Sequence, residues 1–238
     1  MRLHGPESRS KSARPDIGSG LQGRWYVQRR SLLATGSTAL ALLAGRGVAA
    51  RAKEMPSAAG LVRPGDPVYG NPRGAVTIVD FYDLRCPPCR AMDVRIGRLL
   101  AADPAVRYVP IDYPILGAAS LLGAEALLAA RLQGKYKPLR ARLMAEKEPP
   151  TMRTLRAAAK AVGLDWIRLE FDMNGDRVAA MLGANMRLGR AAGVRGTPTL
   201  FIDRTRVNGA LSYADLLSEV ERAERPARLP FAAGQVRG

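Results

Sequence analysis

The fold is decided by residues 80–90, Asp80-Phe81-Tyr82-Asp83-Leu84-Arg85-Cys86-Pro87-Pro88-Cys89-Arg90. Both cysteines of the 238-residue chain lie in this stretch, with two residues between them. An apolar, β-branched run (76–79) precedes it, as in a buried strand, and apolar residues at helical spacing follow from Met92 to Leu100. A Cys-X-X-Cys pair between a strand and a helix is the arrangement of a redox-active dithiol.

The composition narrows the classes of function. A hydrophobic content of 47% is enough for a real core, and with only 5% aromatic residues that core must be mainly aliphatic. The formal net charge of +16 raises the possibility of a nucleic-acid or membrane partner. Outside the first 52 residues, however, the bases are scattered and are not clustered with aromatic side chains. We therefore expect a basic solvated surface and no nucleic-acid groove.

The histidine content limits the chemistry further. His4 is the only histidine, and it lies in the leader described below. The rest of the chain therefore has no histidine base, and its two cysteines lack the further ligands of a Cys/His metal cage. A static disulfide between Cys86 and Cys89 would close a very small loop and stabilise little. We expect neither a metal nor another cofactor.

The first 52 residues have the features of an export signal. Residues 1–24 are polar and rich in Arg, Ser and Gly, and an arginine pair at 29–30 precedes a mildly apolar run, 32–44. Small residues at 48–52 fit a signal cleavage site. The apolar run is shorter than the ~20 residues of a membrane span. Its moderate hydrophobicity after the arginine pair resembles that of a twin-arginine signal. We expect this segment to direct export to the periplasm. Two alternatives are an uncleaved anchor, which would be the only membrane contact of the protein, and a buried amphipathic helix.

The remaining chain predicts an α/β fold. Residues 75–82 and 105–111 have the pattern of strands, and a helix from Pro87 to about Asp103 lies between them. Strand, helix and strand in this order give a parallel pair with a right-handed crossover. Strands are expected again at 199–203 and 206–207, followed by a helix from Ser212 to about Arg222.

Helical spacing dominates the middle of the chain. Helices are expected at 118–133, 136–147, 152–162, 166–173 and 177–192, with Asp165 and Asp176 as N-caps of the last two. The order βαβ, helical block, ββα indicates a small mixed sheet with a helical subdomain inserted in its middle. We expect a leader over 1–52, an extended arm over 53–74, one domain over 75–224 with its insertion at about 115–192, and a loose tail over 225–238.

Several motifs, in the same order, resemble the DsbA-like thiol:disulfide oxidoreductases of the thioredoxin superfamily. They span roughly residues 60–222 and comprise Val76–Asp83 with Cys86-Pro87-Pro88-Cys89, Tyr113–Gly117 with Ser120, Gln133–Tyr136, Ala161–Asp165, Gly193–Ile202 and Val207–Ala210. The resemblance implies a thioredoxin fold and thiol–disulfide exchange. Between their cysteines, strongly oxidising members commonly carry Pro-His where this chain has Pro87 and Pro88.

Cys86 is the expected nucleophile. It precedes a helix, so backbone N–H groups and the positive end of the helix dipole favour its thiolate. The flanking Arg85 and Arg90 would add to this effect if they face the sulfur. Cys89 lies one helical turn further on, and we expect it to be more buried and to close the intramolecular disulfide.

Two further parts of the site are implied by the resemblance. The bond between Thr197 and Pro198 is expected to be cis and to face the dithiol, so that the backbone of Thr197 pairs with a substrate strand. Local sequence alone also allows an ordinary loop proline. Asp80 matches a buried acid that exchanges protons with the deeper cysteine, and burial would raise its pKa. A solvated aspartate at the strand end is the alternative, and Asp83 is a supporting candidate.

The sequence thus favours an exported oxidase that introduces disulfides into cysteine-containing proteins and is reoxidised by a quinone-linked membrane protein. A reductase or isomerase uses the same chemistry, but an isomerase usually needs a dimerisation domain, for which 53–74 is short. A peptide-binding, chaperone-like module with secondary redox activity is a hypothesis of another class. Copper delivery is disfavoured because the mature domain has no histidine and no third cysteine.

Overall fold

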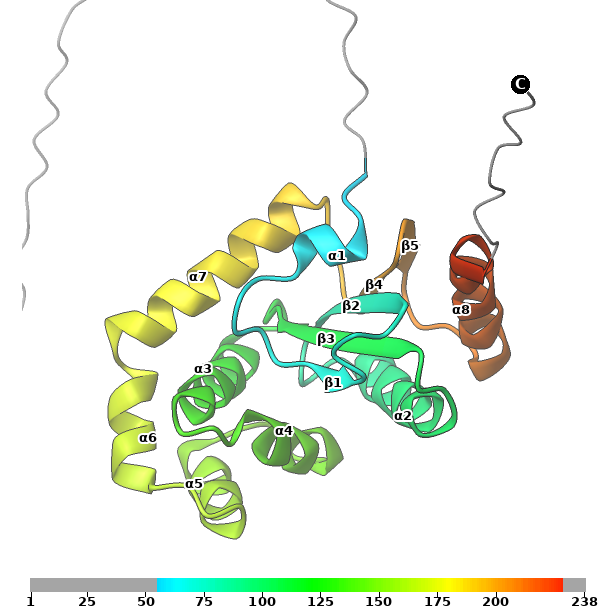
Figure 1. Ribbon diagram of the computed structural model, residues 1–238. Helices are drawn as coiled ribbons and strands as arrows, with labels where there is room; N and C mark the ends of the chain where they lie inside the picture. The colour runs from blue at the N-terminus through cyan, green and yellow to red at the C-terminus, as the bar shows by residue number, and fades with distance from the viewer. Residues whose placement is uncertain (1–54, 229–238) are drawn as a thin grey trace, which may run out of the picture. The chain divides into compact units, whose positions relative to one another are not determined.

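A computed structural model describes residues 55–228, which form one five-stranded mixed sheet and the helices around it (Figure 1). The strand order is β1-β3-β2-β4-β5, in which β2 and β3 are parallel and all other neighbours are antiparallel. The strands are β1 (Tyr69–Gly70), β2 (Val76–Tyr82), β3 (Val106–Asp112), β4 (Thr199–Ile202) and β5 (Thr205–Asn208). The expected α/β thioredoxin fold is confirmed.

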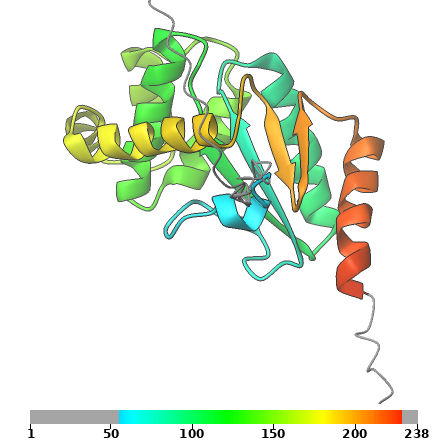
Figure 2. The same cartoon turned by 90° about the horizontal axis from the view of Figure 1, so that it is seen from above.

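Helices cover both faces of the sheet (Figures 1 and 2). α2 (Pro87–Ala102) and α8 (Tyr213–Arg228) pack on one face, where Ile78 of β2 lies in their core. α1 (Ala58–Leu61) and the end of α7 (Asp176–Ala191) pack on the other face with Val79 and Phe81. Because side chains alternate along a strand, Asp80 points to the same face as Ile78, beneath α2.

Five helices lie between β3 and β4 in the chain. They are α3 (Ala118–Leu132), α4 (Tyr136–Ala145), α5 (Met152–Ala161), α6 (Trp166–Met173) and α7. Ala126, Ala129 and Ala130 of α3 are fully buried, which lets α4, α6 and α7 pack closely against this helix. The core of this helical layer also contains Leu84, Cys86 and Cys89, so the layer covers the end of the sheet that carries the dithiol.

The segment expected as an extended arm contains short regular elements. Ala58 and Leu61 of α1 are buried in the core on one face of the sheet, and β1 pairs with β3. Apolar burial and backbone pairing thus recruit this segment into the domain. Asp176 was expected as an N-cap, but Gly175 holds that position and Asp176 is the first residue of α7.

The last helix is longer than the sequence suggests. α8 continues to Arg228, past the predicted end near Arg222 and into the segment expected to be loose. Leu216, Val220 and Glu224 are all buried at a spacing of four residues, so the inward face of the helix persists beyond its apolar part. The leader predicted over 1–52 lies outside the described residues. The helices described between residues 55 and 228 include no candidate for a membrane span.

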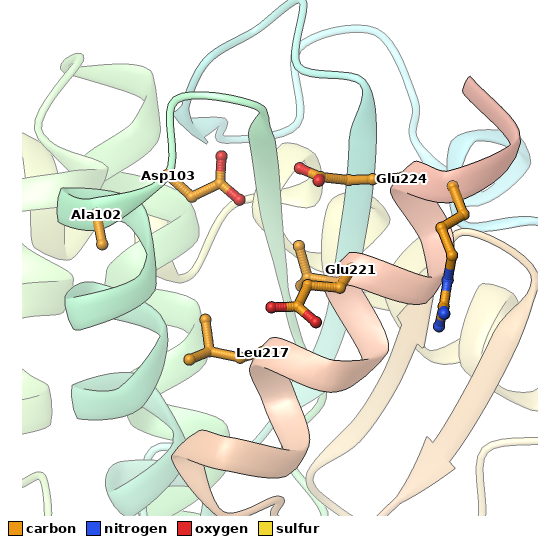
Figure 3. Close-up of a pocket in the computed structure, with 7 residues that line it drawn as sticks. Ala102, Asp103, Leu217, Glu221 and Glu224 are labelled. Carbon is orange, nitrogen blue, oxygen red and sulfur yellow. The ribbon is translucent and has the colours of Figure 1, made fainter. Parts of the chain in front are cut away.

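A cavity of about 540 Å³ lies between the end of α2 and α8 (Figure 3). Asp103, after α2, and Leu217 and Glu221, on α8, point into this gap. The cysteines are at the other end of α2, and a 16-residue helix is roughly 24 Å long. This cavity is therefore separate from the dithiol.

Candidate active site

The two cysteines lie at the start of α2, and Cys89 is the more buried of the two, as predicted. Cys86 is the N-cap residue with an extended backbone, and 5% of it is exposed, against 1% for Cys89. The Cys86 thiol donates a hydrogen bond to the backbone carbonyl of Thr197, at 3.3 Å. The peptide bond between Thr197 and Pro198 is cis, which confirms the expectation. The fold thus brings together two segments 111 residues apart in sequence.

The two prolines change the electrostatics of this helix start. The first three residues of a helix normally present backbone N–H groups that have no intrahelical partner. Here Pro87 and Pro88 occupy the first two positions and have no N–H, while Arg90 already donates its N–H to the carbonyl of Cys86. Only the N–H of Cys89 remains, so the row of donors expected for the Cys86 sulfur is reduced to one.

A buried carboxyl lies beneath the deeper cysteine. Asp80 is 1% exposed, its Oδ2 accepts a hydrogen bond from the hydroxyl of Tyr108 at 3.0 Å, and its Oδ1 has no partner among the described residues. Burial raises the pKa of Asp80 to about 7, against the opposing effects of the Arg140 charge and the Tyr108 hydrogen bond. Burial also raises the pKa of the Cys89 thiol, and the charge of Asp80 raises it further. Asp80 is therefore the more acidic of these two neighbours.

Arg140 extends this polar cluster into the helical layer. Its guanidinium donates to Asp93 at 2.6 Å and to the Tyr108 hydroxyl at 3.3 Å, and it lies 4.4 Å from the centre of the Tyr82 ring. Only 3% of Arg140 is exposed. A hydrogen-bonded path thus runs from Asp80 through Tyr108 and Arg140 to Asp93, whose side chain is partly exposed.

A second buried carboxyl belongs to the same region. Asp112 accepts hydrogen bonds from the hydroxyls of Tyr82, at 2.5 Å, and Tyr136, at 3.1 Å. Burial raises the pKa of Asp112 to about 6, although both hydroxyls oppose the shift. This cluster joins β2, β3 and α4, and no motif in the sequence points to it.

Asp83 organises the loops around Cys86. Its carboxylate accepts hydrogen bonds from the backbone N–H groups of Arg85, Ile115 and Leu116 and from the hydroxyl of Ser120. The apolar side chains of Ile115 and Leu116 are 40% and 43% exposed. The loop after β3 is therefore held near the redox loop and presents apolar surface there.

The two flanking arginines are engaged with backbone carbonyls. Arg85 donates to the carbonyl of Leu116 at 3.1 Å. Arg90 donates to the carbonyls of Leu84, Met144 and Glu146, which fixes the start of α2 to the end of α4. Their hydrogen bonds thus hold loops together. None of these hydrogen bonds is to the Cys86 sulfur, whose thiolate the two arginines were expected to stabilise if they faced it.

The site holds no group of metal ligands. Between residues 55 and 228, no cluster of three or more His, Cys, Asp and Glu side chains could bind a metal ion. The chemistry of the site as built is that of two thiols, one neighbouring carboxyl and a backbone carbonyl beside a cis-proline.

Replacing Asp80 with asparagine is expected to stabilise the reduced protein above neutral pH. The pKa of the carboxyl is 3.8 in its ordinary state and about 7 when folded. As the pH rises from about 4 to 7, the unfolded chain releases this proton while the folded chain retains it, so the wild-type protein loses stability. Asp80→Asn removes this loss, which amounts to about 2 to 4 kcal/mol at pH 8.

Urea unfolding with a reductant, at pH 4 and pH 8, measures this difference. The gap between Asp80→Asn and wild type should widen from pH 4 to pH 8. Glu148→Gln removes an exposed carboxyl and serves as the control, with no such gap. A gap that is the same at both pH values would contradict the raised pKa of Asp80.

Comparisons with known proteins agree with this geometry. A protein-family model described as Thioredoxin matches residues 63–222. A thioredoxin-like oxidoreductase from Silicibacter pomeroyi DSS-3 is 38% identical, with a TM-score of 0.66 over 69% of this chain and 95% of that one. The thiol-disulfide exchange protein alpha-DsbA2 from Wolbachia pipientis is 28% identical, with a TM-score of 0.61 over 66% and 86%.

Two further proteins are similar to this chain, one of them periplasmic and the other much longer than this chain. A periplasmic thioredoxin-like protein from Salmonella enterica serovar Typhimurium is 25% identical, with a TM-score of 0.61 over 68% of this chain and 91% of that one. A curated relative, the Na(+)/H(+) antiporter NhaA 3 of Salinispora tropica, is 29% identical over 172 residues, which are 71% of this chain. The chain spans about a quarter of the length of such antiporters, 26% in this case.

Proposed function

Because the chain belongs to the thioredoxin family, we propose that it is a thiol:disulfide oxidoreductase that oxidises cysteine pairs in exported proteins through Cys86 and Cys89. One observation carries the proposal: the Cys86 thiol lies against the Thr197 carbonyl, beside the cis-proline Pro198. A substrate strand that pairs with the backbone of Thr197 would bring its own sulfur to Cys86.

The oxidising step is an exchange of sulfur–sulfur bonds. A substrate thiolate attacks Sγ of Cys86 in the Cys86–Cys89 disulfide, and the bond to Cys89 breaks as the bond to the substrate forms. Cys89 leaves with the electron pair and takes a proton from the carboxyl of Asp80. A second substrate thiolate then attacks the substrate sulfur, closes the substrate disulfide and releases Cys86 as a thiolate. Two electrons pass from the substrate to the cysteine pair.

Asp80 suits the role of proton donor to Cys89. With a pKa of about 7, it is largely protonated in mildly acidic conditions and can give up its proton near neutrality. The raised pKa of Cys89 means that its thiolate takes up a proton readily. The same pair would run in reverse when the dithiol is reoxidised, for which we propose a quinone-linked membrane protein.

The periplasm is the proposed location. The leader predicted over 1–52 supports export, and the similarity to a periplasmic thioredoxin-like protein agrees with it. An oxidising compartment also suits a chain whose two cysteines form one redox pair.

An oxidase is favoured over an isomerase by the fold of the segment before the sheet. Ala58 and Leu61 are buried in the domain core, and Tyr69 and Gly70 pair with β3. Residues 58–70 thus serve the domain itself and do not provide a separate dimerisation module. The apolar side chains of Ile115 and Leu116 near the dithiol also suit contact with unfolded, reduced chains.

The equilibrium of the Cys86–Cys89 pair with glutathione tests the direction of the reaction. The oxidase predicts a reduction potential nearer to the ~−120 mV of DsbA than to the ~−270 mV of thioredoxin, which the Cys86 thiolate must reach with fewer backbone N–H donors than a proline-free helix start provides. The fractions of reduced and oxidised protein across glutathione buffers give this value. A potential near that of thioredoxin would contradict the oxidase and favour a reductase.

Pro88→Ala provides a matched test of the helix start. The substitution restores one N–H group near the Cys86 sulfur, and one hydrogen bond to a charged acceptor stabilises it by about 1.5 kcal/mol. The reduced form gains this stabilisation, so the potential should become about 30 mV less negative. An unchanged potential would mean that the missing N–H groups do not limit the thiolate.

A further inference from the structure

A second cavity lies at the cis-proline loop, whose residue Thr197 contacts the reactive thiol. Its volume is about 550 Å³, and its lining includes Arg195, Thr197, Arg206 and Asn208. Thr197 belongs both to this cavity and to the contact with the Cys86 thiol. A chain whose sulfur reaches Cys86 therefore has neighbouring residues at the mouth of this cavity, because consecutive residues of a strand are only about 3.3 Å apart.

The charges around this cavity are all positive. No acidic residue lines it, and neither Arg195 nor Arg206 forms an ion pair or side-chain hydrogen bond with another residue of the described segment. Elsewhere in the domain, arginines such as Arg63 and Arg140 are paired with aspartates. Two guanidinium groups with free donors thus face one cavity beside the dithiol.

The position of Arg206 is built into the fold. Arg206 lies on the edge strand β5, and its Nη1 is 3.1 Å from the point where a Cβ at Gly193 would be. Gly193 has a φ of +76°, which suits a glycine, and its missing side chain leaves room for the guanidinium. The guanidinium is therefore packed against the loop that carries Thr197, at the wall of the cavity.

A smaller basic cavity on the other side of Cys86 is a weaker candidate. It is lined by Arg85, Pro87, Arg90 and Lys147. Both of its arginines already donate to backbone carbonyls, as described above. Lys147 makes no side-chain hydrogen bond or ion pair with another described residue, so this cavity has one unengaged cation, against two guanidinium groups at Arg195 and Arg206.

We propose that the cavity at Arg195 and Arg206 is a subsite for the carboxylate of an aspartate or glutamate one or two residues from the reacting cysteine of the substrate. The inference rests on the proposed thiol–disulfide exchange and adds a preference among substrates. Guanidinium groups pair with carboxylates through two parallel hydrogen bonds, which fixes orientation as well as charge. The enzyme would thus react faster with cysteines in acidic sequence contexts.

The test uses single-cysteine peptides activated as 2-pyridyl disulfides and the Cys89→Ala variant. The Cys86 thiolate attacks the peptide sulfur, a peptide–Cys86 disulfide forms, and the sulfur–sulfur bond to the pyridine breaks. The released pyridine-2-thiolate is followed by its absorbance after protonation to the thione. Peptides carry Glu or Gln at one position, from two residues before to two residues after the cysteine.

We expect a rate ratio of Glu to Gln peptides of about fivefold at the best position, at low ionic strength, falling at high salt. R195Q/R206Q in the same background should bring this ratio close to one. R187Q/R204Q removes two exposed arginines that do not line the cavity and should preserve the ratio.

A Glu-to-Gln rate ratio that R195Q/R206Q leaves unchanged would overturn the subsite, and so would three other results. These are equal rates for Glu and Gln peptides, a preference that is the same at every peptide position, and a loss of the preference in R187Q/R204Q. The last two would assign the effect to the general positive field of the protein. If Cys86 reacts with none of the peptides, including the neutral ones, the proposed thiol–disulfide exchange itself fails, which is a different result from the loss of selectivity.

Discussion

Replacing Cys86 with alanine is expected to abolish thiol–disulfide exchange. Cys86 is the cysteine whose sulfur contacts the Thr197 carbonyl, and Cys89 is nearly fully buried with its pKa raised, so it cannot take over the attack. Oxidation of a reduced two-cysteine peptide by the purified protein, followed by chromatography, measures the loss. We expect a fall of at least about 10³-fold, to the uncatalysed background.

Cys89→Ala is the matched variant for this experiment. Here it is mixed with a single-cysteine peptide activated as a 2-pyridyl disulfide. The Cys86 thiolate attacks the peptide sulfur and pyridine-2-thiolate leaves. Because neither Cys89 nor a second peptide thiol is present to attack the mixed disulfide, the covalent complex should accumulate. Mass spectrometry after acid quenching detects this complex. If Cys86→Ala keeps its activity, or if Cys86→Ala forms the complex with the activated peptide through Cys89, the assignment of the two sulfurs is wrong.

The Cys86→Ala variant also separates catalysis from peptide binding. The exposed apolar side chains of Ile115, Leu116 and Leu121 could hold unfolded chains without any redox step. Suppression of aggregation of a reduced client protein by Cys86→Ala, compared with wild type, measures this. Protection that is fully retained would favour a chaperone-like module as the main role, whereas loss of protection together with exchange supports the oxidoreductase.

Arg140→Met is expected to destabilise the protein by about 3 to 5 kcal/mol. Arg140 is 3% exposed and is the buried cation among Asp80, Asp93 and several tyrosine rings. Removing one partner from a buried charge cluster leaves the remaining charges without compensation, which costs about this much. Because the charge of Arg140 lowers the pKa of Asp80, its removal should also raise that pKa.

Urea unfolding at pH 7 measures the loss of stability. Arg142→Met, an exposed change on the same helix, is the control, with an expected effect within about 0.5 kcal/mol. Arg140→Lys retains the charge without the forked donors and should recover part of the loss. A stability of Arg140→Met within about 0.5 kcal/mol of wild type would contradict the role of this cluster.

Most of the fold and the dithiol could be predicted from local sequence. The apolar run at 76–79, the Cys-X-X-Cys spacing and the strand after Pro198 are each visible within a few residues, and resemblance joined them. Asp80 was identified in the same way, and its side of the sheet follows from the alternation that places Ile78 beneath α2. The two prolines between the cysteines are also visible in the sequence, but the expectation of N–H donors to Cys86 did not take their two missing N–H groups into account.

The polar cluster of Tyr108, Arg140 and Asp93 next to Asp80 could not be derived in this way, because it depends on long-range packing. Tyr108 lies in β3 and Arg140 in α4, 32 residues apart, and only the folded helical layer brings them together. One local signal was available. Arg140 falls four residues after Tyr136 and four before Met144, both buried, so a charged residue lies on the inward face of its helix.

In the sequence, Cys86 comes before the five helices α3 to α7, and Thr197, which it contacts, comes after them. During synthesis, Thr197 emerges more than a hundred residues after Cys86, so the contact closes late and its loop is costly to close. Until β4 has paired with β2, the nascent chain carries two ordinary thiols on an unfinished sheet. The contact that places the Thr197 carbonyl beside the Cys86 sulfur is thereby a property of the completed fold, and an immature copy has two thiols but no site that positions a substrate strand.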